Sequence, residues 1–408
     1  MVTPHPPSGA ASPLASDTSN PHLVAAIRAE IDARGGRMPF ARFMDLALYH
    51  PEWGYYLTET RRPGRSGDFL TAPEAHPFFG ITLARQIAEC WDRLGQPRRF
   101  VVREYGPGIG GLAWDIIGGL TREAPGCLAA LEYRFVERNR HRLEQALAVF
   151  AAEGLGDVVR GEASSGLEDV APEQIEGVVL ANEVADAFGV HRLIWRNGQL
   201  RERWVIWNGG SFAEEEGELS AEASAADPER MLRAAGIALA DGDRIEISPA
   251  AERWFASAAR GLGRGYALVI DYGYTAPELY RGHRLEGTVR AYRAHTVSND
   301  PFGHVGEQDL TAHVDFSALR RAGEREGLLF AGQTNQGAFL ASLGMGDLLV
   351  ALGKDRETDV TEYMAAQAAI LRLIDPGGLG RFGVLMMTRD TPVEPVLRGF
   401  TVLPLTFS

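Results

Sequence analysis

The chain has 408 residues, 45% of them hydrophobic, and a formal net charge of −13. This length predicts two domains, or one sheet-based domain that carries large insertions. The negative charge argues against nucleic acid or an anionic membrane as a partner. The sequence contains no apolar run of about 18 residues, so we predict no membrane span. The two cysteines, Cys90 and Cys127, form neither a metal-binding nor a disulfide pattern, so we expect a cytoplasmic protein.

The N-terminal quarter of the chain is predicted to be helical. Residues 1–20 are rich in Pro, Ser, Ala and Thr and are expected to form a disordered tail. Residues 21–98 are expected to form a helical cap that contains an irregular, aromatic-rich stretch at 52–77. The predicted helices of this cap span 22–34, 40–49 and 78–94.

Strands and helices alternate over residues 99–190, which predicts an α/β fold with a doubly wound, Rossmann-like parallel sheet. The alternation then breaks, and 191–263 and 276–326 are expected to form an inserted α+β region. The sheet resumes in 264–275 and 327–390. The predicted strands are 99–104, 131–137, 158–160, 177–182, 244–247, 266–271, 328–333 and 382–388, with a hairpin at 191–207. The other predicted segments are helices at 112–120, 141–152, 248–262, 339–352 and 360–373, and an acidic linker at 214–227.

A glycine-rich turn follows the first predicted strand of the sheet. Its sequence is Glu104-Tyr105-Gly106-Pro107-Gly108-Ile109-Gly110. Glycines let the backbone turn tightly and let a ligand meet the N–H groups at the start of the next helix. The spacing G-x-G-x-G differs from the dinucleotide pattern G-x-G-x-x-G and suits a ligand without a pyrophosphate. Because Glu104 can hold the ammonium group of a methionine moiety, we predict S-adenosyl-L-methionine as the cofactor.

Polar side chains also end the other predicted strands. Glu137 ends the second strand, where an acid can accept hydrogen bonds from ribose hydroxyls, in adenosylmethionine and NAD alike. Asn182 and Glu183 end the fourth strand, where they either orient an acceptor or cap the next helix. The sequence 271–273 after the fifth strand leaves the same two interpretations open.

His313 and Asp315 form an HxD pair, but their spacing matches no structural zinc pattern. We therefore expect no metal site.

Several further segments resemble one known family, the MidA-like methyltransferases, over residues 21–388. The matching segments are Tyr49-His50-Pro51, Gly54-Tyr55-Tyr56, Gly67-Asp68-Phe69-Leu70-Thr71-Ala72-Pro73-Glu74, Ala181-Asn182-Glu183, Asp186-Ala187, Asp271-Tyr272-Gly273, Gly287-Thr288-Val289-Arg290-Ala291-Tyr292 and Gly306-Glu307-Gln308-Asp309-Leu310-Thr311-Ala312-His313-Val314-Asp315-Phe316. The resemblance implies a class I methyltransferase core with a helical N-terminal segment and an inserted region that covers the substrate.

The same resemblance implies roles for individual residues. The residues implied to bind the cofactor are Gly67, Asp68 and Thr71, which close its pocket, Glu104, Gly106, Pro107, Gly108 and Gly110, which cradle its methionine end, and Glu137, which holds the ribose. Asn182 and Glu183 are implied to face the transferred methyl group, with Asn182 also on the cofactor. Tyr292 is the third residue expected at the reaction centre.

The acceptor of the methyl group, at nitrogen, oxygen or carbon, stays open at this point. The family includes a mitochondrial arginine methyltransferase needed to assemble respiratory complex I, which implies a protein acceptor. Aromatic residues such as Trp53 and Tyr56 would instead suit a small molecule. A non-catalytic assembly factor is a third reading, and a homodimer is one open arrangement. The turn departs from the family pattern at Tyr105, Ile109 and Gly111, beside the expected pocket.

Overall fold

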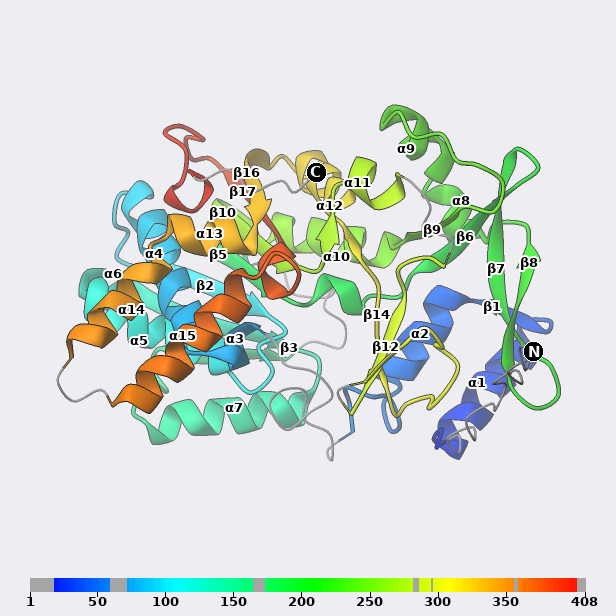
Figure 1. The fold of residues 1–408 in the computed structure, drawn as a ribbon, viewed down its shortest axis with the longest axis horizontal. Coiled ribbons are helices and arrows are strands. Elements are labelled where there is room, and N and C mark those ends of the chain that lie inside the picture. The colour runs from blue at the N-terminus through cyan, green and yellow to red at the C-terminus, as the bar shows by residue number, and fades with distance from the viewer. Residues whose placement is uncertain are drawn as a thin grey trace, which may run out of the picture.

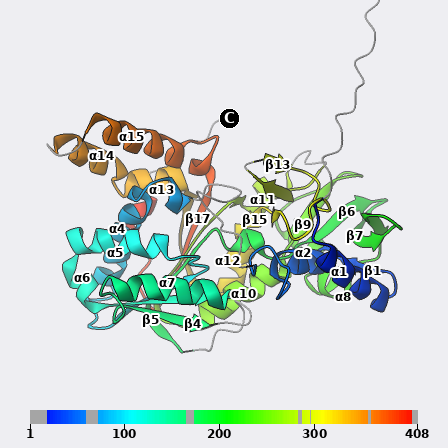
Figure 2. The same cartoon turned by 90° about the horizontal axis from the view of Figure 1, so that it is seen from below.

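The computed structural model of the chain describes residues 18–58, 72–163, 173–281, 286–294, 296–355 and 359–401. These residues form two lobes that lie side by side along the long axis of the molecule (Figure 1, Figure 2). The larger lobe contains a seven-stranded sheet, and the smaller lobe contains a five-stranded sheet. Of the expected disordered tail, 1–17 lie outside the described residues. Asn20, by contrast, belongs to the fold, because its backbone N–H donates to the carbonyl of Val305 at 3.0 Å.

The strand order of the larger sheet is β16-β17-β10-β5-β2-β3-β4. In that order the strands are Leu329–Asn335, Gly383–Arg389, Leu262–Asp271, Ile175–Asn182, Phe100–Tyr105, Leu131–Glu137 and Val159–Ala163. All are parallel except β17, which is antiparallel to both β10 and β16. The predicted doubly wound α/β sheet is thus confirmed. Chain order runs outward from β2 through β3 and β4 on one side and through β5 and β10 on the other, and β17 then lies between β10 and β16. The switch point of the sheet is therefore between β2 and β5.

Helices cover both faces of this sheet. One face carries α4 (Phe78–Arg93), α5 (Gly111–Glu123), α6 (Pro125–Ala130) and α7 (Arg140–Ala152), and the other carries α10 (Pro249–Arg260) and α12 (Phe316–Arg325). Along β2, Val102 packs on the face that carries α4 and α5, and Val101 packs on the face that carries α10 and α12, as the two-residue period of a strand requires. The strands are therefore buried on both faces, which explains their apolar sequences.

A helical insertion separates β16 from β17. It consists of α13 (Gln336–Ser342), α14 (Met345–Lys354) and α15 (Val360–Ile374). The single helix predicted over 339–352 is wrong, because Gly344 adopts a φ of 78° and the helices meet at 56°. No single helix in the described ranges is long and apolar enough to cross a membrane, although α13 and α14 together would meet that length and composition.

The smaller lobe combines the N-terminal segment with the inserted region. Its sheet has the order β1-β7-β6-β9, with β8 also paired to β7. Its strands are β1 (Arg37–Pro39), β6 (His191–Arg196), β7 (Gln199–Trp207), β8 (Phe212–Gly217) and β9 (Arg244–Ile247), and its helices are α1 (Pro21–Ala33), α2 (Phe40–Tyr49), α8 (Ala221–Ala225), α9 (Pro228–Ala234) and α11 (Ala276–Tyr280). Because β1 pairs with β7, the segment 21–98 is shared: α1 and α2 belong to the smaller lobe and α4 to the larger.

The acidic linker predicted at 214–227 is wrong. Its first residues form β8, whose carboxylates pair with arginines on the neighbouring strands. Glu214 contacts both Arg192 and Arg203, and Glu216 contacts Arg196 at 3.0 Å. These cross-strand pairs offset the low strand propensity of consecutive glutamates.

Short elements complete the described chain. They are α3 (Ala72–Ala75), η1 (Ala185–Ala187), β11 (Gly273–Tyr274), β12 (Arg290–Arg293), β13 (Thr296–Ser298), β14 (Asp309–Thr311), β15 (Val314–Asp315), η2 (Leu379–Arg381) and η3 (Arg398–Phe400). β12 lies between β13 and β14 in a small antiparallel sheet, and β11 pairs with β15.

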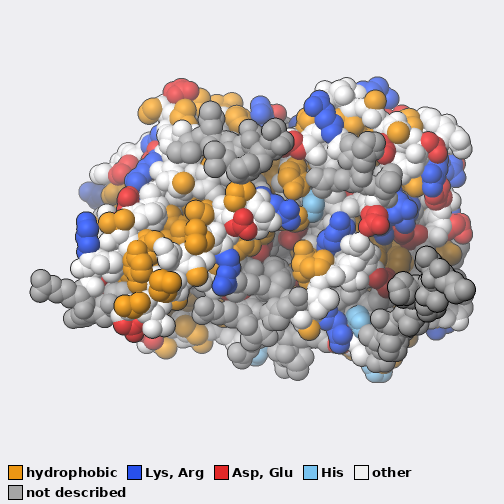
Figure 3. Space-filling model, viewed as in Figure 1, with side chains coloured by type: hydrophobic (Ala, Val, Ile, Leu, Met, Phe, Trp, Pro, Cys, Tyr) orange, Lys and Arg blue, Asp and Glu red, His pale blue; other side chains and the backbone are white. Residues whose placement is uncertain are grey.

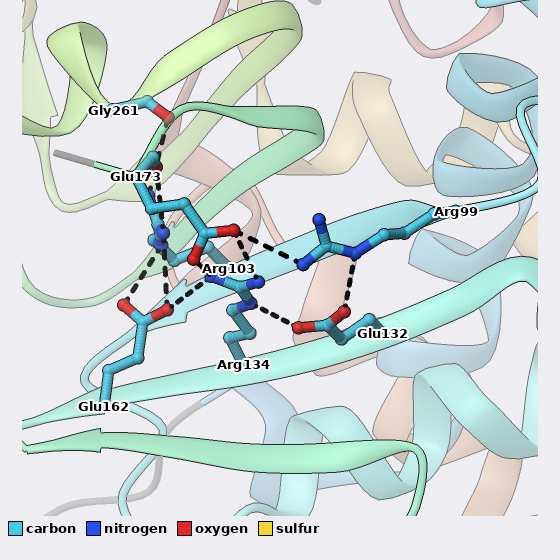
Figure 4. A network of polar contacts seen from close by, with 7 residues as sticks. All are labelled: Arg99, Arg103, Glu132, Arg134, Glu162, Glu173 and Gly261. Atoms are coloured by element: carbon cyan, nitrogen blue, oxygen red, sulfur yellow. Dashed lines mark hydrogen bonds and ion pairs between the residues drawn. The ribbon is translucent and has the colours of Figure 1, made fainter.

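An ion-pair network joins β2, β3 and β4 on the face that carries α10 (Figure 4). Arg103 on β2 is fully buried, and its Nε lies 3.2 Å from the Glu162 carboxylate on β4. Arg134 on β3 contacts three carboxylates, those of Glu132, Glu162 and Glu173. The network thereby fixes three neighbouring strands relative to one another at the edge of the sheet.

Candidate active site

The glycine-rich sequence forms a tight turn between β2 and α5. Gly106, Gly108 and Gly110 have φ angles of 65°, 57° and 85°, in the left-handed region that favours glycine. The turn is closed by a hydrogen bond from the N–H of Gly110 to the carbonyl of Pro107 at 2.8 Å. A Cβ on Gly106 would lie 2.9 Å from Val184, whereas one on Gly108 would meet open space. Because these three glycines have no Cβ, a ligand can approach the backbone at the carboxyl end of β2 and the N–H groups at the N-terminus of α5.

Glu104 is a buried carboxylate immediately before this turn. Its Oε2 accepts a hydrogen bond from the hydroxyl of Tyr133 at 2.8 Å. Burial raises the pKa of Glu104 to about 7, the bond from Tyr133 opposes that rise, and the charge of Glu137 adds to it. No described Lys, Arg or His forms an ion pair with Glu104. A bound ammonium group would therefore stabilise its charged form.

Glu137 lies at the carboxyl end of β3, next to the turn. Its carboxylate accepts a hydrogen bond from the N–H of Asn139 at 2.8 Å. Burial raises the pKa of Glu137, and backbone N–H groups, including that of Gly108, oppose the rise. An acid in this position can accept hydrogen bonds from ribose hydroxyls, as in other nucleotide-binding sheets.

Asn182 and Glu183 end β5, beside the switch point of the sheet. Oε1 of Glu183 accepts bonds from the N–H of Ala72 at 3.0 Å and from Nδ2 of Asn182 at 3.2 Å. Glu183 has a φ of 54°, a strained value for a residue with a Cβ. Oδ1 of Asn182 is buried and has no hydrogen-bond partner within the described chain. Strain and an unsatisfied acceptor at one strand end are typical of a binding site.

The alternative that Asn182 and Glu183 cap the following helix is wrong. The segment after β5 is only the short turn η1, and its N-terminal N–H groups are bound by Asp271 instead. Oδ2 of Asp271 accepts from the N–H groups of Val184 at 3.0 Å and Ala185 at 2.8 Å. Of the two interpretations of 271–273, Asp271 thus takes the structural one.

Three carboxyl groups lie where the strand ends of the larger sheet meet the smaller lobe: Glu183 after β5, Asp186 in η1 and Asp309 on β14. Asp186 belongs to η1, and the negative charges of Asp271, Asp309 and Glu183 add to burial in raising its pKa well above the ordinary value. Burial raises the pKa of Glu183 to about 8, and Asp271 adds to the rise. Asp309 on β14 is fully buried, and the hydroxyl of Tyr56 donates to its carboxylate, 2.8 Å from Oδ1 and 2.9 Å from Oδ2. The arrangement concentrates carboxyl groups in one buried place, where a cationic ligand would favour their charged forms.

Aromatic residues surround these carboxylates. Tyr49 stacks on Tyr56 with 5.4 Å between ring centroids, and Tyr292 on β12 is the cross-strand neighbour of Asp309. The segment around Tyr56 is anchored to the larger lobe by the bond from Nδ2 of Asn139 to the carbonyl of Tyr56 at 2.9 Å. The space-filling view shows the molecule hollowed between the lobes, with acidic and basic side chains along the hollow (Figure 3).

The structure thus brings most of the predicted site residues to one end of the sheet. These are Glu104, Gly106, Pro107, Gly108, Gly110, Glu137, Asn182, Glu183 and Tyr292. Gly67, Asp68 and Thr71 lie outside the described residues. Among those that are described, no three His, Cys, Asp or Glu side chains are grouped to hold a metal ion. Asp315 of the HxD pair caps α12 through the N–H of Ala318.

Of the three departures in the turn, Tyr105 points away from the proposed pocket and Ile109 is exposed to solvent. Tyr105 is buried on the α10 face, where its ring meets that of Trp254 edge-on at 5.7 Å. Ile109 is 63% exposed. Sequence reasoning assigned no role to Asp186 or Asp309, and the one available signal was that both stand in segments that match the family.

The strand order, the glycine turn after β2 and the acids at the ends of β2 and β3 define a class I, nucleotide-cofactor methyltransferase. The residues fit adenosylmethionine: Glu104 for the ammonium group, Glu137 for the ribose and an unsatisfied Asn182 at the methyl end.

Comparison with known proteins supports this class. Residues 82–334 match a family described as S-adenosyl-L-methionine-dependent methyltransferases. A solved protein of Burkholderia thailandensis, described as a likely methyltransferase bound to S-adenosyl-homocysteine, is 34% identical. The match covers 93% of this chain and 94% of that one, with a TM-score of 0.80. The chain therefore belongs to the MidA-like family of adenosylmethionine-dependent methyltransferases, and it is an enzyme of that class.

The curated relatives carry a more particular name. The mitochondrial protein arginine methyltransferase NDUFAF7 homologue of Drosophila melanogaster is 29% identical over 80% of this chain and 75% of its own length. The human NDUFAF7 protein is 27% identical over 81% of this chain and 75% of its own. The expectation of a cytoplasmic protein is wrong on this finding, because these relatives are mitochondrial proteins. Composition and cysteine count indicate a reducing compartment, but they do not say which compartment it is.

Proposed function

We propose that this chain methylates a guanidinium nitrogen of an arginine side chain in a protein. The observation that carries the proposal is the convergence of Glu183, Asp186 and Asp309 beside the strand ends. A guanidinium is planar, always charged and rich in N–H donors, so it matches a cluster of carboxylates better than a neutral acceptor does. The arginine methyltransferase name of the relatives points the same way.

The raised pKa values give a physical reason for this choice. Neither Glu183 nor Asp186 forms an ion pair with a Lys, Arg or His within the described part of the chain. Burial therefore disfavours their charged forms, and the charge of Glu183 adds to the raised pKa of Asp186. A guanidinium bound between them would lower both pKa values and would be held by that gain.

We assign the cofactor to the end of the sheet between β2 and β5. Glu104 would hold its ammonium group, the turn Gly106 to Gly110 its methionine backbone, and Glu137 its ribose. The residues 67, 68 and 71 keep their assignment from the family resemblance alone. When bound, adenosylmethionine supplies an electrophilic methyl group on a positively charged sulfur.

Glu183 is the residue we assign to the acceptor nitrogen. Methylation forms a bond from that nitrogen to the methyl carbon, breaks the bond from carbon to sulfur, and releases one proton from the guanidinium. The Glu183 carboxylate would orient the N–H and take up that proton. Asn182 steadies Glu183 through its Nδ2, and Tyr292 borders the acceptor beside Asp309.

The test is methylation of a peptide library by the purified chain with isotope-labelled adenosylmethionine. We expect label on arginine side chains, located by fragment masses in a mass spectrometer. Peptides in which lysine replaces every arginine should stay unlabelled. Label on lysine, on a hydroxyl or on carbon would overturn the arginine proposal.

A further inference from the structure

Beside the carboxylates lies a second group of side chains, which contains two arginines and two tyrosines. Its members are Arg290, Arg381, Tyr272 and Tyr292, which come from β12, η2 and the end of β10. One extended segment, from Asp309 to Asp315, connects this group to the carboxylates. Its N–H groups at Ala312 and Val314 donate to the carbonyls of Asp186 and Tyr272, both at 3.0 Å.

Arg381 is the outer member of the group. Its guanidinium carbon lies 4.6 Å above the ring of Tyr272, and that ring meets His313 edge-on at 4.2 Å. Arg381 is exposed, and no described Asp or Glu forms an ion pair with it. Its charge is thus held in place by an aromatic face and remains available to an anion.

Arg290 is the inner member. Its Nη1 donates to the carbonyls of Val289 at 2.7 Å and Gly287 at 3.4 Å, which hold the side chain without neutralising it. It stands two residues before Tyr292 on β12, so both side chains project from the same face of the strand. Arg290 likewise forms no ion pair with an acid in the described ranges.

Tyr292 marks the border between the two charges. Beyond burial, which raises the pKa of its hydroxyl, Asp186 and Asp309 raise it further, whereas Arg290 and Arg381 lower it. Both signs of charge therefore act on one phenol. Arg134 in the larger lobe differs, because three carboxylates neutralise it.

We propose that Arg381 and Arg290 form a carboxylate subsite, so that the acceptor presents an Asp or Glu next to the arginine that is methylated. The proposal rests on the proposed arginine function and adds a sequence preference to it. The guanidinium of the acceptor would lie on the acidic side of Tyr292 and its neighbouring carboxylate on the basic side. Guanidinium and carboxylate pair well, since their geometries allow two parallel hydrogen bonds.

The experiment compares two peptides that differ in one residue beside the arginine, Asp in one and Asn in the other. We expect kcat/KM to be about fivefold higher for the Asp peptide, since Arg381 is partly solvated, and the preference to shrink with added salt. In Arg381→Gln the ratio of the two kcat/KM values should fall towards 1, and it should reach about 1 when Arg290→Gln is added, because each arginine contributes to the subsite. In Arg381→Glu a peptide with Lys in that place should become the better substrate.

Arg28→Gln is the matched control, because Arg28 also lies over an aromatic ring, that of Trp207 at 4.4 Å, but on α1. It should keep the wild-type ratio. Equal rates on both peptides, or a ratio that survives Arg381→Gln, would overturn the subsite and leave the arginine function standing. Methylation of neither peptide, with label appearing on another residue type, would overturn the proposed function and the subsite with it.

Discussion

At the scale of single residues, the site is built from carboxylates whose pKa values are raised before any ligand arrives. Glu104 has a pKa of about 7 and Glu183 one of about 8, in both cases chiefly through burial. Buried acids without a cationic partner cost free energy in the folded state. The cofactor and the proposed acceptor both carry positive charge. Their binding would therefore stabilise the charged forms of these acids and offset that cost.

Glu183 should make the reaction pH-dependent. The carboxylate form is required to hold the acceptor, so kcat/KM should rise with pH and level off above about 8. Glu183→Gln removes the titrating group and should lower kcat/KM by at least about 100-fold, with a flat profile in this range. The measurement is a pH–rate profile of methyl transfer. Retention of the wild-type profile by the variant would show that another group titrates.

Glu104 should control cofactor affinity. Glu104→Gln removes the charge opposite the ammonium group and should weaken adenosylmethionine binding by about 10- to 100-fold, the value of a charge-assisted hydrogen bond. Calorimetric titration measures this directly. Its control is the adjacent Tyr105→Leu, which places the family residue in the turn.

Tyr105 packs on Trp254 away from the pocket, so Tyr105→Leu should keep cofactor affinity. It should instead lower the free energy of unfolding by about 1–3 kcal/mol through lost packing. Equal affinity loss in both variants would mean that the turn tolerates no change and that Glu104 has no special role.

At the scale of elements, buried polar pairs connect neighbouring strands within each of the two sheets. In the larger lobe Arg103 and Arg134 join β2, β3 and β4 (Figure 4). In the smaller lobe His191 on β6 lies 2.7 Å from Glu202 on β7 and 3.4 Å from Glu222 on α8. Removing one member of either group should lower the free energy of unfolding, because its charged partners would lose a buried contact.

Arg103→Met should therefore lower the free energy of unfolding by about 3 kcal/mol or more, since it removes one of the two arginines that pair with Glu162 and leaves the carbonyls of Glu173 and Gly261 without their donor. The comparison is Arg99→Met, whose side chain is 60% exposed and pairs with Glu132. That variant should cost less than about 1 kcal/mol. Urea unfolding of the two variants decides, and equal costs would show that burial of Arg103 adds nothing.

His191 should make stability fall at alkaline pH. Burial alone lowers the pKa of His191, but the carboxylates of Glu202 and Glu222 outweigh it and raise the pKa to about 9. An unfolded histidine titrates near 6.5, so the proton is held more tightly in the folded state. The stabilisation is complete below about pH 6.5 and is lost as pH rises through about 9. Urea midpoints from about pH 6 to 10 should fall less steeply in His191→Gln than in wild type, and parallel curves would exclude this pair as the cause.

How far the sequence predicts the elements depends on where their stability comes from. The strands of the larger sheet are apolar because both faces are buried, so composition alone indicates them. β8 was missed because its glutamates are stabilised by arginines on β6 and β7, which no local pattern reveals. The helix over 339–352 was predicted as one because a lone Gly344 is compatible with a helix until tertiary packing bends it.

The same distinction applies to the site. Glu104, Glu137 and Glu183 stand at strand ends, so the alternation of strands and helices along the chain is enough to place them together. Asp309 lies in an insertion far from Asp186 in the chain, and only the folded structure brings the segment after β14 onto η1, through the bond from the N–H of Ala312 to the carbonyl of Asp186. The pairing of Tyr56 with Asp309 joins segments 253 residues apart, which spacing cannot predict.

At the scale of the whole molecule, the two lobes have different proposed roles. The larger lobe carries the elements common to class I methyltransferases and the proposed cofactor contacts. The smaller lobe, assembled from the N-terminal segment and the insertions, supplies Tyr56, Asp309 and Tyr292 to the proposed acceptor side. We propose that the carboxyl groups at their junction select the acceptor.

A crystal structure of the chain with S-adenosyl-homocysteine and an arginine peptide is the most direct test of the proposed site. We predict the homocysteine amino group at Glu104, the ribose at Glu137, and the sulfur facing Asn182 and Glu183. We also predict an acceptor guanidinium nitrogen within about 3 Å of the Glu183 carboxylate. A guanidinium bound outside the hollow, or a cofactor sulfur turned away from the end of β5, would contradict the assignment.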